Sequence, residues 1–503
     1  MPKSLEKISN SVFSFCTSVS EITIPENVSE IGSSAFHRCD SLKELVLPEK
    51  LEKIEDYLLY GCGNLESVVI PDGVTEIGIC AFSECKSLKE INIPKTVTII
   101  GENAFRYCES ITEIEIPENV TEIFGICSGC TSLEKAVLPD SITTIGYESF
   151  FNCSNLEEIN IPKNLENVMA VAFANCTKLK KAVLTDKIKA IGSGAFRDCE
   201  LITEITIPDT IELISDNAFQ GCTGIKNVTM PEKKQFEMSR LAFEDTPWYD
   251  DLQAENDIVI INGMLVDALK CKGEFEIPDG VDIICSYAFG DFEKGSMVTS
   301  IKGAEKIKIF RDCAFVNCKE LKEFTIPDTL EVIPYGMFSS CESLEKVVIS
   351  ESVKQIESGA FSWCDSLKEL VIPKNVEYFG GLTDSNEGKI TTVIFENPNC
   401  FINGGSINFP SFPYSAVLKG YADSTAYRIA RAMELKFEEI YLEGDANADG
   451  ELSVADLVTI TKWLKSDYTY EEKLKSSKAA DIDENGSIDV FDLIALRKML
   501  LEN

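Results

Sequence analysis

Residues 70–94 read IPDGVTEIGICAFSECKSLKEINIP, and this arrangement of apolar residues, glycine, cysteine and proline recurs along most of the chain. Its cysteine marks the period. Steps of 23 residues, with one step of 22, relate Cys16, Cys39, Cys62, Cys85, Cys108, Cys130, Cys153, Cys176, Cys199 and Cys222, and the series resumes at Cys318, Cys341 and Cys364. A fixed period of this length indicates a stack of repeated structural units.

Each repeat contains the elements of one coil. Ile91-Asn92-Ile93 alternates with the period of a strand that has one buried face, and Pro94 ends that strand. The V-x-x-I-G and A-F segments are expected to form the return path. A single unit cannot bury its apolar side, whereas stacked units align their apolar residues in columns about 4.8 Å apart. The repeat therefore predicts a solenoid with a parallel β-sheet on one face.

Breaks in the period predict the domain organisation. About ten coils run in phase to Pro231, and about four more end near Pro373. The Asn262-Gly263 pair predicts a hairpin between the two blocks, and Ser424 is a predicted helix N-cap. The predicted segments are a first repeat block at 1–230, an irregular insertion with a hairpin at 231–275, a second block at 276–415, a C-terminal cap at 416–440 and a terminal module at 441–503.

The repeat resembles the leucine-rich repeats of the BspA-like type over about residues 1–440. Phe243 to Tyr249 (FEDTPWY) is similar to an insertion that interrupts many such arrays, and Gly420 to Phe437 is similar to the helix and strand that close them. The resemblance implies a right-handed leucine-rich-repeat solenoid in a secreted or surface protein of bacteria or some protists.

Composition limits the classes of partner. The chain has 503 residues, 44% of them hydrophobic, with 47 Lys and Arg against 83 Asp and Glu and a net charge of −36. This charge disfavours nucleic acid and anionic membranes as partners, and the chain has no apolar run long enough to span a bilayer. Met1 falls within an ongoing repeat, and Met1 to Thr17 lacks a signal-peptide pattern. We therefore expect further repeats and a secretion signal upstream of Met1.

Cysteine and histidine chemistry is expected to be absent. The 19 cysteines are predicted to be mainly buried hydrophobic residues rather than disulfides, because side chains in register point the same way. Cys127-Ser-Gly-Cys130 resembles a redox motif, but Cys127 occupies the phenylalanine position of its repeat and is predicted to be structural. His37, the single histidine, is predicted to face solvent, which disfavours catalytic pairs and metal sites that need histidines.

An outward-facing column of carboxylates is predicted on the sheet. Its members are Glu21, Glu44, Glu90, Glu113, Glu158, Glu204, Glu323 and Glu369, and Lys135, Lys181 and Lys346 interrupt it. We interpret the column first as a solvated acidic face and second as a possible ligand face. A glycosidase-like pair of carboxylates is the least favoured interpretation, because the neighbouring outward column has no aromatic residue to stack on a sugar.

Two twelve-residue loops near the C-terminus have the spacing of calcium sites. Ca²⁺ takes six to eight oxygen ligands, and glycine at the sixth loop position permits the sharp turn. Gly450 and Gly486 stand at that position. The predicted ligands are Asp445, Asn447, Asp449, Glu451, Ser453 and Asp456 in the first loop, and Asp481, Asp483, Asn485, Ser487, Asp489 and Asp492 in the second, with Glu451 and Ser487 contributing backbone carbonyls.

These loops resemble those of type I dockerins over about residues 441–503. Aspartate rather than glutamate stands at position 12, and no entering helix is predicted before the first loop. The resemblance implies a small all-α module of two EF-hand-like loop–helix motifs with two Ca²⁺ ions, which binds a cohesin module of a scaffold protein. The positions that contact cohesin map to Val454, Ala455, Thr461, Lys462, Val490, Phe491, Arg497 and Lys498. Val454-Ala455 and Val490-Phe491 stand where the best-known dockerins carry Ser-Thr.

The two resemblances together predict a non-catalytic, secreted binding subunit that a dockerin attaches to an extracellular, cellulosome-type scaffold. The solenoid is expected to bind a protein or a glycan. Two alternatives stay open: a glycan-active enzyme with its site in the irregular regions around 231–310 or 380–415, and a surface adhesin. An enzyme needs a concave site with perturbed acids, whereas a binding solenoid has an open face.

Overall fold

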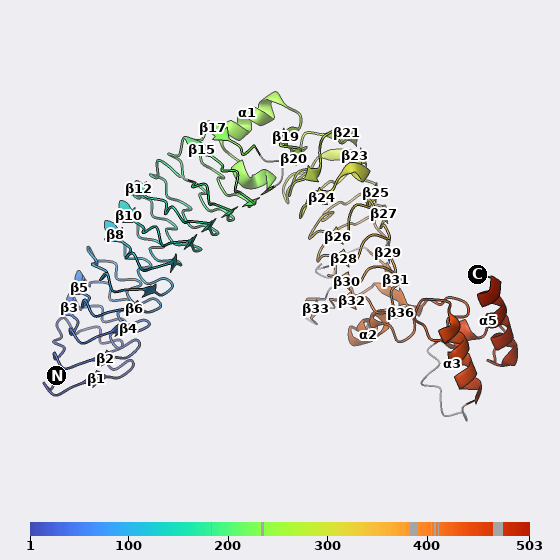
Figure 1. The fold of residues 1–503 in the computed structure, drawn as a ribbon, viewed down its shortest axis with the longest axis horizontal. Coiled ribbons are helices and arrows are strands. Elements are labelled where there is room, and N and C mark those ends of the chain that lie inside the picture. The colour runs from blue at the N-terminus through green and yellow to red at the C-terminus, as the bar shows by residue number, and fades with distance from the viewer. Residues whose placement is uncertain are drawn as a thin grey trace. The chain divides into compact units, whose positions relative to one another are not determined.

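The structure is a computed structural model that describes residues 1–182, 184–232, 236–382, 390–403, 405–406, 409–410, 412–465 and 476–502. It consists of two compact units, residues 1–256 and residues 257–503 (Figure 1). Stacked coils make up the first unit and the earlier part of the second. Part of the irregular region predicted at 380–415 lies outside the described residues.

Most of the Ile-x-Ile-type segments of the first unit form parallel strands, as predicted, whereas residues 22–24 and 91–93 are not in a strand. Strands β3, β5 and β8 each pair with a neighbouring strand in parallel. In each of them the first and third residues are exposed and the central residue is buried. This alternation places the apolar central residue in the core and the flanking residues in solvent. The strands are β3 (Glu44–Val46), β5 (Ser67–Val69), β8 (Glu113–Glu115), β10 (Lys135–Val137), β12 (Glu158–Ile159), β15 (Glu204–Thr206) and β17 (Asn227–Thr229).

A second parallel ladder lies on the return path, in addition to the one sheet face that was predicted. The residues before each V-x-x-I-G glycine also pair from coil to coil, because their backbone groups need partners inside the stack and the next coil offers them. Its strands are β1 (Lys7–Ile8), β2 (Glu30–Ile31), β4 (Lys53–Ile54), β6 (Glu76–Ile77), β7 (Ile99–Ile100), β9 (Glu122–Ile123), β11 (Thr144–Ile145), β13 (Asn167–Val168), β14 (Ala190–Ile191), β16 (Leu213–Ile214) and β18 (Glu237–Met238).

The A-F-x-x-C segment turns each coil and fills its core. In one coil, Asn103 and Tyr107 have left-handed backbone conformations, with φ of 58° and 56°. Phenylalanines of successive coils stack on one another: the ring centroids of Phe173 and Phe196 are 5.2 Å apart. The thiol of Cys199 donates a hydrogen bond to the carbonyl of Phe173 at 3.2 Å. From Cys39 onward, the cysteines of the ladder are small core residues that also satisfy a backbone carbonyl.

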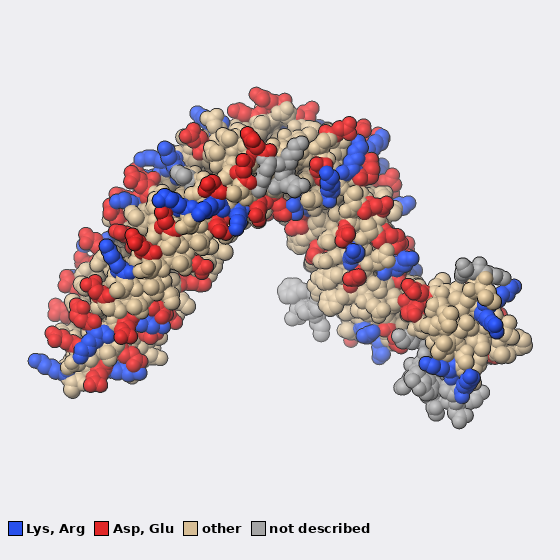
Figure 2. All heavy atoms as spheres, viewed as in Figure 1, with Lys and Arg blue, Asp and Glu red and all other residues tan. Residues whose placement is uncertain are grey.

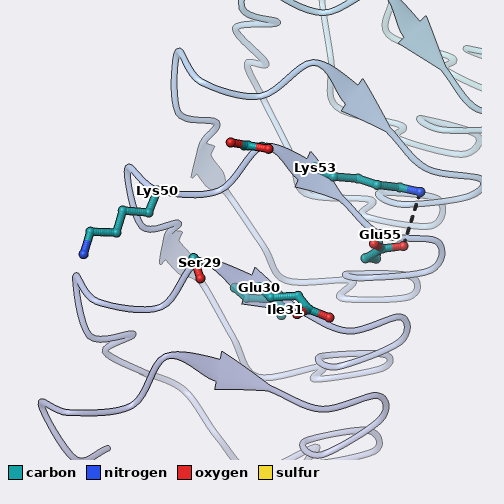
Figure 3. Close-up of a pocket in the computed structure, with 7 residues that line it drawn as sticks. Ser29, Glu30, Ile31, Lys50, Lys53 and Glu55 are labelled. Carbon is teal, nitrogen blue, oxygen red and sulfur yellow. Dashed lines mark ion pairs between the residues drawn. The ribbon is translucent and has the colours of Figure 1, made fainter.

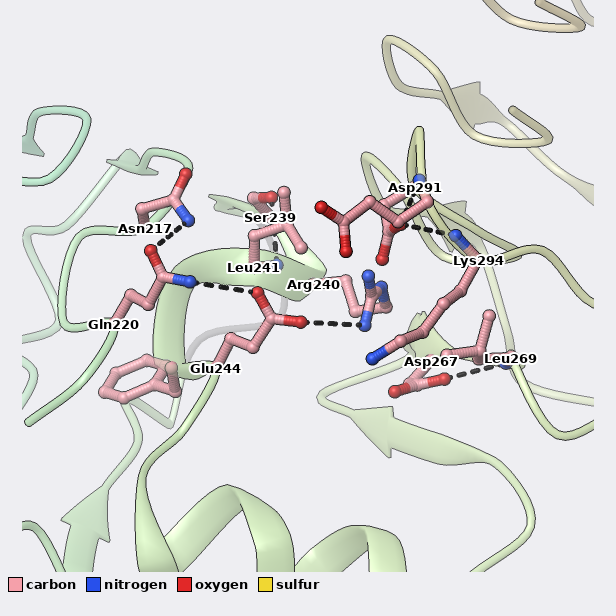
Figure 4. A network of polar contacts seen from close by, with 12 residues as sticks. Asn217, Gln220, Ser239, Arg240, Leu241, Glu244, Asp267, Leu269, Asp291 and Lys294 are labelled. Carbon is pink, nitrogen blue, oxygen red and sulfur yellow. Dashed lines mark hydrogen bonds and ion pairs between the residues drawn. The ribbon is translucent and has the colours of Figure 1, made fainter. Parts of the chain in front are cut away.

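The first unit ends in a 3₁₀ helix, η1 (Arg240–Phe243), and helix α1 (Pro247–Glu255). The amide of Asn217 donates to Gln220 Oε1 at 2.7 Å, and Gln220 donates to Glu244 Oε2 at 3.2 Å (Figure 4). Glu244 Oε1 lies 3.8 Å from Nη1 of the buried Arg240. This chain of contacts supplies a partner for a guanidinium that would be costly to bury alone.

The second unit repeats the two ladders. Its β19–β20 hairpin turns at Asn262 and Gly263, which both have positive φ, as the dipeptide predicts. In the same unit, Asp267 and Asp291 each accept a backbone hydrogen bond at 2.7 Å, from Leu269 and Lys294 respectively (Figure 4). Such bonds close short turns locally.

One ladder of the second unit contains β21 (Lys272–Glu276), β23 (Met297–Lys302), β25 (Glu323–Thr325), β27 (Lys346–Val348), β29 (Glu369–Ile372), β31 (Thr392–Phe395), β35 (Val417–Gly420) and β36 (Lys436–Glu439). The other contains β19 (Val259–Ile261), β20 (Met264–Asp267), β22 (Ile283–Ile284), β24 (Ile309–Phe310), β26 (Val332–Ile333), β28 (Gln355–Ile356), β30 (Tyr378–Phe379) and β32 (Phe401–Ile402). The remaining elements here are η2 (Ala304–Lys306), β33 (Gly405–Ser406) and β34 (Phe409–Pro410).

Helices appear at the C-terminal end of the second unit. Helix α2 (Thr425–Ala432) begins at the predicted cap, where Ser424 Oγ accepts a hydrogen bond from the Tyr427 amide at 3.2 Å. Three more helices follow: α3 (Val454–Lys465), α4 (Ser477–Ala480) and α5 (Val490–Glu502). Ile460 of α3 and Leu496 of α5 are buried in a small core of their own. Among the described residues, no helix has the length and apolarity needed to cross a bilayer.

Candidate functional site

The two predicted calcium loops have the same backbone conformation. The fourth and sixth positions are left-handed in both: φ is 53° at Ala448 and 85° at Gly450, and 55° at Glu484 and 83° at Gly486. Glycine adopts this conformation without strain, which explains its place at the sixth position of each loop. Thirty-six residues separate equivalent positions, so the chain builds one loop conformation twice.

The first aspartate of each loop holds the turn together. Asp445 Oδ2 accepts a hydrogen bond from the Gly450 amide at 2.8 Å, and Asp481 Oδ2 accepts one from Gly486 at the same distance. Their Oδ1 atoms accept from the backbone amides at the fifth loop positions. These backbone hydrogen bonds orient the two carboxylates within their loops.

The last aspartate of each loop begins the following helix. Asp456 Oδ2 accepts a hydrogen bond from the Ser453 amide at 2.8 Å, and Asp492 Oδ2 accepts one from Asp489 at 2.8 Å. This is the reciprocal half of a capping box, in which a side chain in the first turn satisfies the amide of the capping residue. Loop closure and helix initiation therefore depend on the same carboxylates.

The donor set suits a hard cation. Asp445, Asp456 and Asp492 are buried carboxylates, and no described ion pair joins them to a Lys or Arg. In the second loop, carboxylate oxygens of Asp481, Asp483 and Asp492 lie within 4.8 Å of one another. The first loop has Asn447, with an amide oxygen, at the position that Asp483 occupies in the second loop. Burial raises the pKa of Asp445 to about 6 and also raises the pKa of Asp456. Uncompensated buried charge of this kind favours a bound cation.

The residues predicted to contact cohesin lie at the surface. Val454, Val490 and Phe491 are exposed large apolar side chains at the starts of α3 and α5. Ala455, Lys462, Arg497 and Lys498 are also exposed, and Thr461 is partly buried. The sequence reading missed Val458 and Ile494, which are exposed one helical turn later and also 36 residues apart. The sequence contained a signal for these two residues: they are apolar and stand four positions after Val454 and Val490, which places them on the same helix face.

In the first unit, the predicted acidic column lies on the outside. Glu21, Glu44, Glu90, Glu113, Glu158 and Glu204 are all exposed. Strand pairing places Lys135 between Glu113 and Glu158, with its Nζ 4.0 Å from Glu113 Oε2. Acidic and basic side chains are interspersed over the visible face (Figure 2). These observations favour the interpretation of the column as a solvated face with local charge compensation.

A charged hollow of about 300 Å³ lies between the first coils of the first unit. Its walls include Glu30, Lys50, Lys53 and Glu55 (Figure 3). Lys53 Nζ lies 2.9 Å from Glu76 Oε1 and 3.5 Å from Glu55 Oε2. Lys53 is thus paired with carboxylates of the protein itself. We therefore interpret the hollow as a gap between neighbouring surface side chains and not as a ligand-binding site.

Cysteine and histidine environments test two further predictions. All 19 cysteines are free thiols, and all but Cys16, Cys80 and Cys271 are buried. A hydrogen bond to Cys130 and burial raise the pKa of the Cys127 thiol well above its usual value, opposite to a redox-active thiol. The prediction for His37 was wrong: its ring is partly buried and lies 5.0 Å from the Tyr60 ring, because side chains at this position stack from coil to coil.

We expect the denatured chain to titrate about 19 thiols with a disulfide reagent in the absence of reductant. The native protein is expected to react slowly, with Cys16, Cys80 and Cys271 first, because the other thiols are buried. Thiol counting before and after addition of guanidinium measures both. Recovery of only a few thiols after denaturation would contradict the buried-ladder assignment and require disulfides.

The family model described as a BspA type leucine rich repeat region matches residues 6–127, 124–249 and 268–391. No curated protein matches the chain. Solved structures that resemble it include a leucine-rich repeat protein from Bacteroides ovatus, with 24% identity, coverage of 86% of this chain and 92% of that chain, and a TM-score of 0.39.

A leucine-rich cell surface protein from Faecalibacterium prausnitzii is 22% identical, with 89% and 86% of the two chains covered and a TM-score of 0.24. The pneumococcal vaccine antigen PcpA is 15% identical, with 87% and 89% covered and a TM-score of 0.30. These superpositions are too loose to transfer a function. The family model, by contrast, covers well over half of the residues in three consecutive matches, and the chain belongs to the BspA-type leucine-rich repeat family.

Proposed function

We propose that this chain is a non-catalytic extracellular binding protein whose residues 441–503 form a calcium-dependent dockerin that attaches the repeat solenoid to a cohesin-bearing, cellulosome-type scaffold. The observation that carries the proposal is the duplicated loop, in which a buried carboxylate with no ion pair among the described residues and a left-handed glycine recur at a spacing of 36 residues. A single acidic loop has many explanations, whereas two with the same hydrogen bonds support paired calcium sites.

The exposed apolar residues support a docking surface on this module. Val454 and Val458 lie one turn apart on α3, and Val490 and Ile494 occupy the equivalent positions on α5. Soluble proteins rarely expose apolar side chains in such clusters without a partner. Lys462 and Arg497 lie farther along the same helices, so the partner surface is expected to combine apolar residues with acidic ones at its edge.

Capture by cohesins tests the proposal. The full chain is expected to bind at least one cohesin of its source bacterium in calcium, and Asp445→Ala combined with Asp481→Ala is expected to abolish capture. Phe491→Ala is expected to weaken the affinity about tenfold or more, because a large exposed apolar side chain at an interface centre is a typical hot spot. Pull-down with immobilised cohesins, followed by calorimetry, measures both effects.

The matched control is Ala455→Ser, at the loop position equivalent to Phe491, which changes little apolar area and is expected to have a smaller effect. Glu44→Gln and Glu113→Gln, in the acidic column, are expected to leave capture unchanged. Failure of every cohesin to bind in calcium would refute the docking assignment while leaving the repeat family unaffected.

The repeat solenoid is proposed to bind a protein or a glycan, with the scaffold holding it near its target. Enzymatic activity is the weaker alternative. In the acidic column, the carboxylates stand on an open face, and Lys135 separates two of them. A glycosidase pair requires two carboxyl groups that flank the scissile bond in a substrate cleft, with one of them protonated to act as the general acid.

A further inference from the structure

A second hollow lies on the repeat coils of the second unit, in the region of β24, β26 and β28 (Figure 1). It has a volume of about 160 Å³. Its walls come from four consecutive coils, and its lining residues are Phe292, Cys313, Tyr335, Gly336, Ser339, Gly359, Ser362 and Trp363. Three coil steps of about 4.8 Å give it a length of about 14 Å along the stack.

Three exposed aromatic side chains border this hollow. Phe292 is 65% exposed, Tyr335 is 50% exposed and Trp363 is 41% exposed. None of the described aromatic pairs includes Tyr335, so its ring faces are not covered by another ring. The aromatic residues of the first coils differ in this respect. There, His37 stacks between Phe15 and Tyr60 at 5.1 and 5.0 Å, so these rings cover one another's faces.

Glycine makes room for the hollow. Gly336 has a φ of 58°, and a Cβ at this position would lie 2.8 Å from Cys313 Sγ. Other coils carry Tyr57, Cys80 or Asn103 at the equivalent position. A side chain there would cover the space between the aromatic residues, so the glycine is what keeps the hollow open.

Hydroxyl groups provide the polar contacts. Ser339 is only 8% exposed and lines the hollow, yet its hydroxyl has no hydrogen-bond partner among the described residues. The Ser362 hydroxyl also lines the hollow and donates a hydrogen bond to the Leu382 carbonyl at 3.4 Å. The Ser339 hydroxyl is therefore the one that is available to a ligand in the hollow as both donor and acceptor.

We infer that this hollow, defined here as the aromatic groove, binds a neutral saccharide. The inference rests on the proposed function and names the class of ligand that the solenoid binds. The rings offer faces for the C–H surface of a sugar, since their negative faces attract C–H groups. Ser339 offers a hydroxyl that both donates and accepts hydrogen bonds, as sugar hydroxyls do. No lining residue is charged, and the net charge of −36 disfavours acidic polysaccharides.

A proline-rich peptide is the main competitor for an aromatic-lined groove. Its backbone would offer Ser339 and Ser362 mainly carbonyl acceptors, because proline has no N–H group. The Ser339 hydroxyl would then act only as a donor, whereas a sugar hydroxyl can both accept a hydrogen bond from it and donate one to it. The observed lining therefore favours the saccharide.

The inference is tested with the full chain and four neutral hexasaccharides, which are β-1,4-linked glucose, xylose or mannose and α-1,4-linked glucose. At least one is expected to bind by calorimetry and to change the fluorescence of Trp363. Trp363→Ala and Tyr335→Ala are each expected to weaken binding about tenfold or more. Ser339→Ala is expected to weaken it about threefold to tenfold, the effect of one hydrogen bond.

Tyr107→Ala is the matched control. Tyr107 and Trp363 each precede a ladder cysteine and share the left-handed conformation, with φ of 56° and 58°. Both substitutions therefore change the same backbone position, and only one lies in the aromatic groove. Binding by the Tyr107→Ala variant is expected to equal that of the unaltered protein.

Three outcomes would overturn the inference: none of the four hexasaccharides binds, Trp363→Ala and Tyr335→Ala leave binding unchanged, or a proline-rich dodecapeptide binds at these residues in their place. The double variant Asp445→Ala and Asp481→Ala separates this inference from the docking proposal. It is expected to lose cohesin capture and to retain saccharide binding, so either activity can fail alone.

Discussion

Removal of calcium from the full chain is expected to unfold residues 441–503 and to leave the repeat coils folded. The terminal module has a core of four buried residues, Ala446, Ile460, Ala480 and Leu496, with a few partly buried neighbours. A core of this size supplies little stability by itself. The carboxylates of both loops repel one another without a cation, so ion binding and folding are expected to be coupled.

The size of this effect follows from ligand linkage. Each site adds about 4 kcal/mol to the free energy of unfolding when free calcium exceeds its dissociation constant about a thousandfold. Two sites therefore decide whether so small a module is folded. The loss is expected to be cooperative, since Asp456 and Asp492 both close a loop and begin a helix.

Hydrogen exchange with mass spectrometry measures the change in the intact chain. In excess chelator, amide protection in α3 and α5 is expected to fall to that of unstructured peptides, while protection of β8 to β16 stays constant. Asp445→Ala with Asp481→Ala is expected to reproduce the chelator result in the presence of calcium. Persistent protection of both helices without calcium would refute the proposed coupling.

Truncation of one ring in the phenylalanine ladder is expected to destabilise the first unit by about 3–5 kcal/mol, the usual cost of Phe→Ala in a core. Phe173 is 0% exposed, and its ring lies 5.3 Å from Phe150 and 5.2 Å from Phe196. Phe173→Ala removes contacts with the coils on both sides and leaves a cavity between them. In a repeat protein, stability resides largely in such interfaces between neighbours.

Phe15→Ala is the control, because Phe15 is 65% exposed and its truncation is expected to change stability by about 0.5 kcal/mol or less. Urea denaturation of both variants measures the difference. Local hydrogen exchange around residues 150–200 shows whether the loss is confined to the adjacent coils. Equal effects of the two substitutions would contradict a core role for the ladder.

The 23-residue spacing was sufficient to predict the stacked coils, their outward and inward residues and the buried cysteines. The reason is that the period is local: apolar and outward residues alternate over a few positions, as at Glu44, Leu45 and Val46, and the next coil repeats that alternation at a fixed separation. The same argument made Asn262-Gly263 a hairpin turn and Ser424 a helix cap, since each depends on nearby backbone geometry alone.

Features that depend on contacts between coils were not predicted from the sequence. The second ladder consists of pairs such as Glu122–Ile123, which are too short to have a recognisable strand pattern. His37 was expected in solvent, but its stacking partners Phe15 and Tyr60 are more than 20 residues away in the sequence. Backbone pairing and ring stacking across coils become visible only when the coils are aligned in space.

The sequence by itself determined the repeat architecture and the spacing of the two acidic loops, because both are encoded by residues at short, regular intervals. Only the tertiary structure identified the aromatic groove, because Phe292, Tyr335 and Trp363 come from different coils and follow no common repeat position. It also identified the unpartnered hydroxyl of Ser339, since whether a polar group is satisfied depends on every neighbour that packing brings to it.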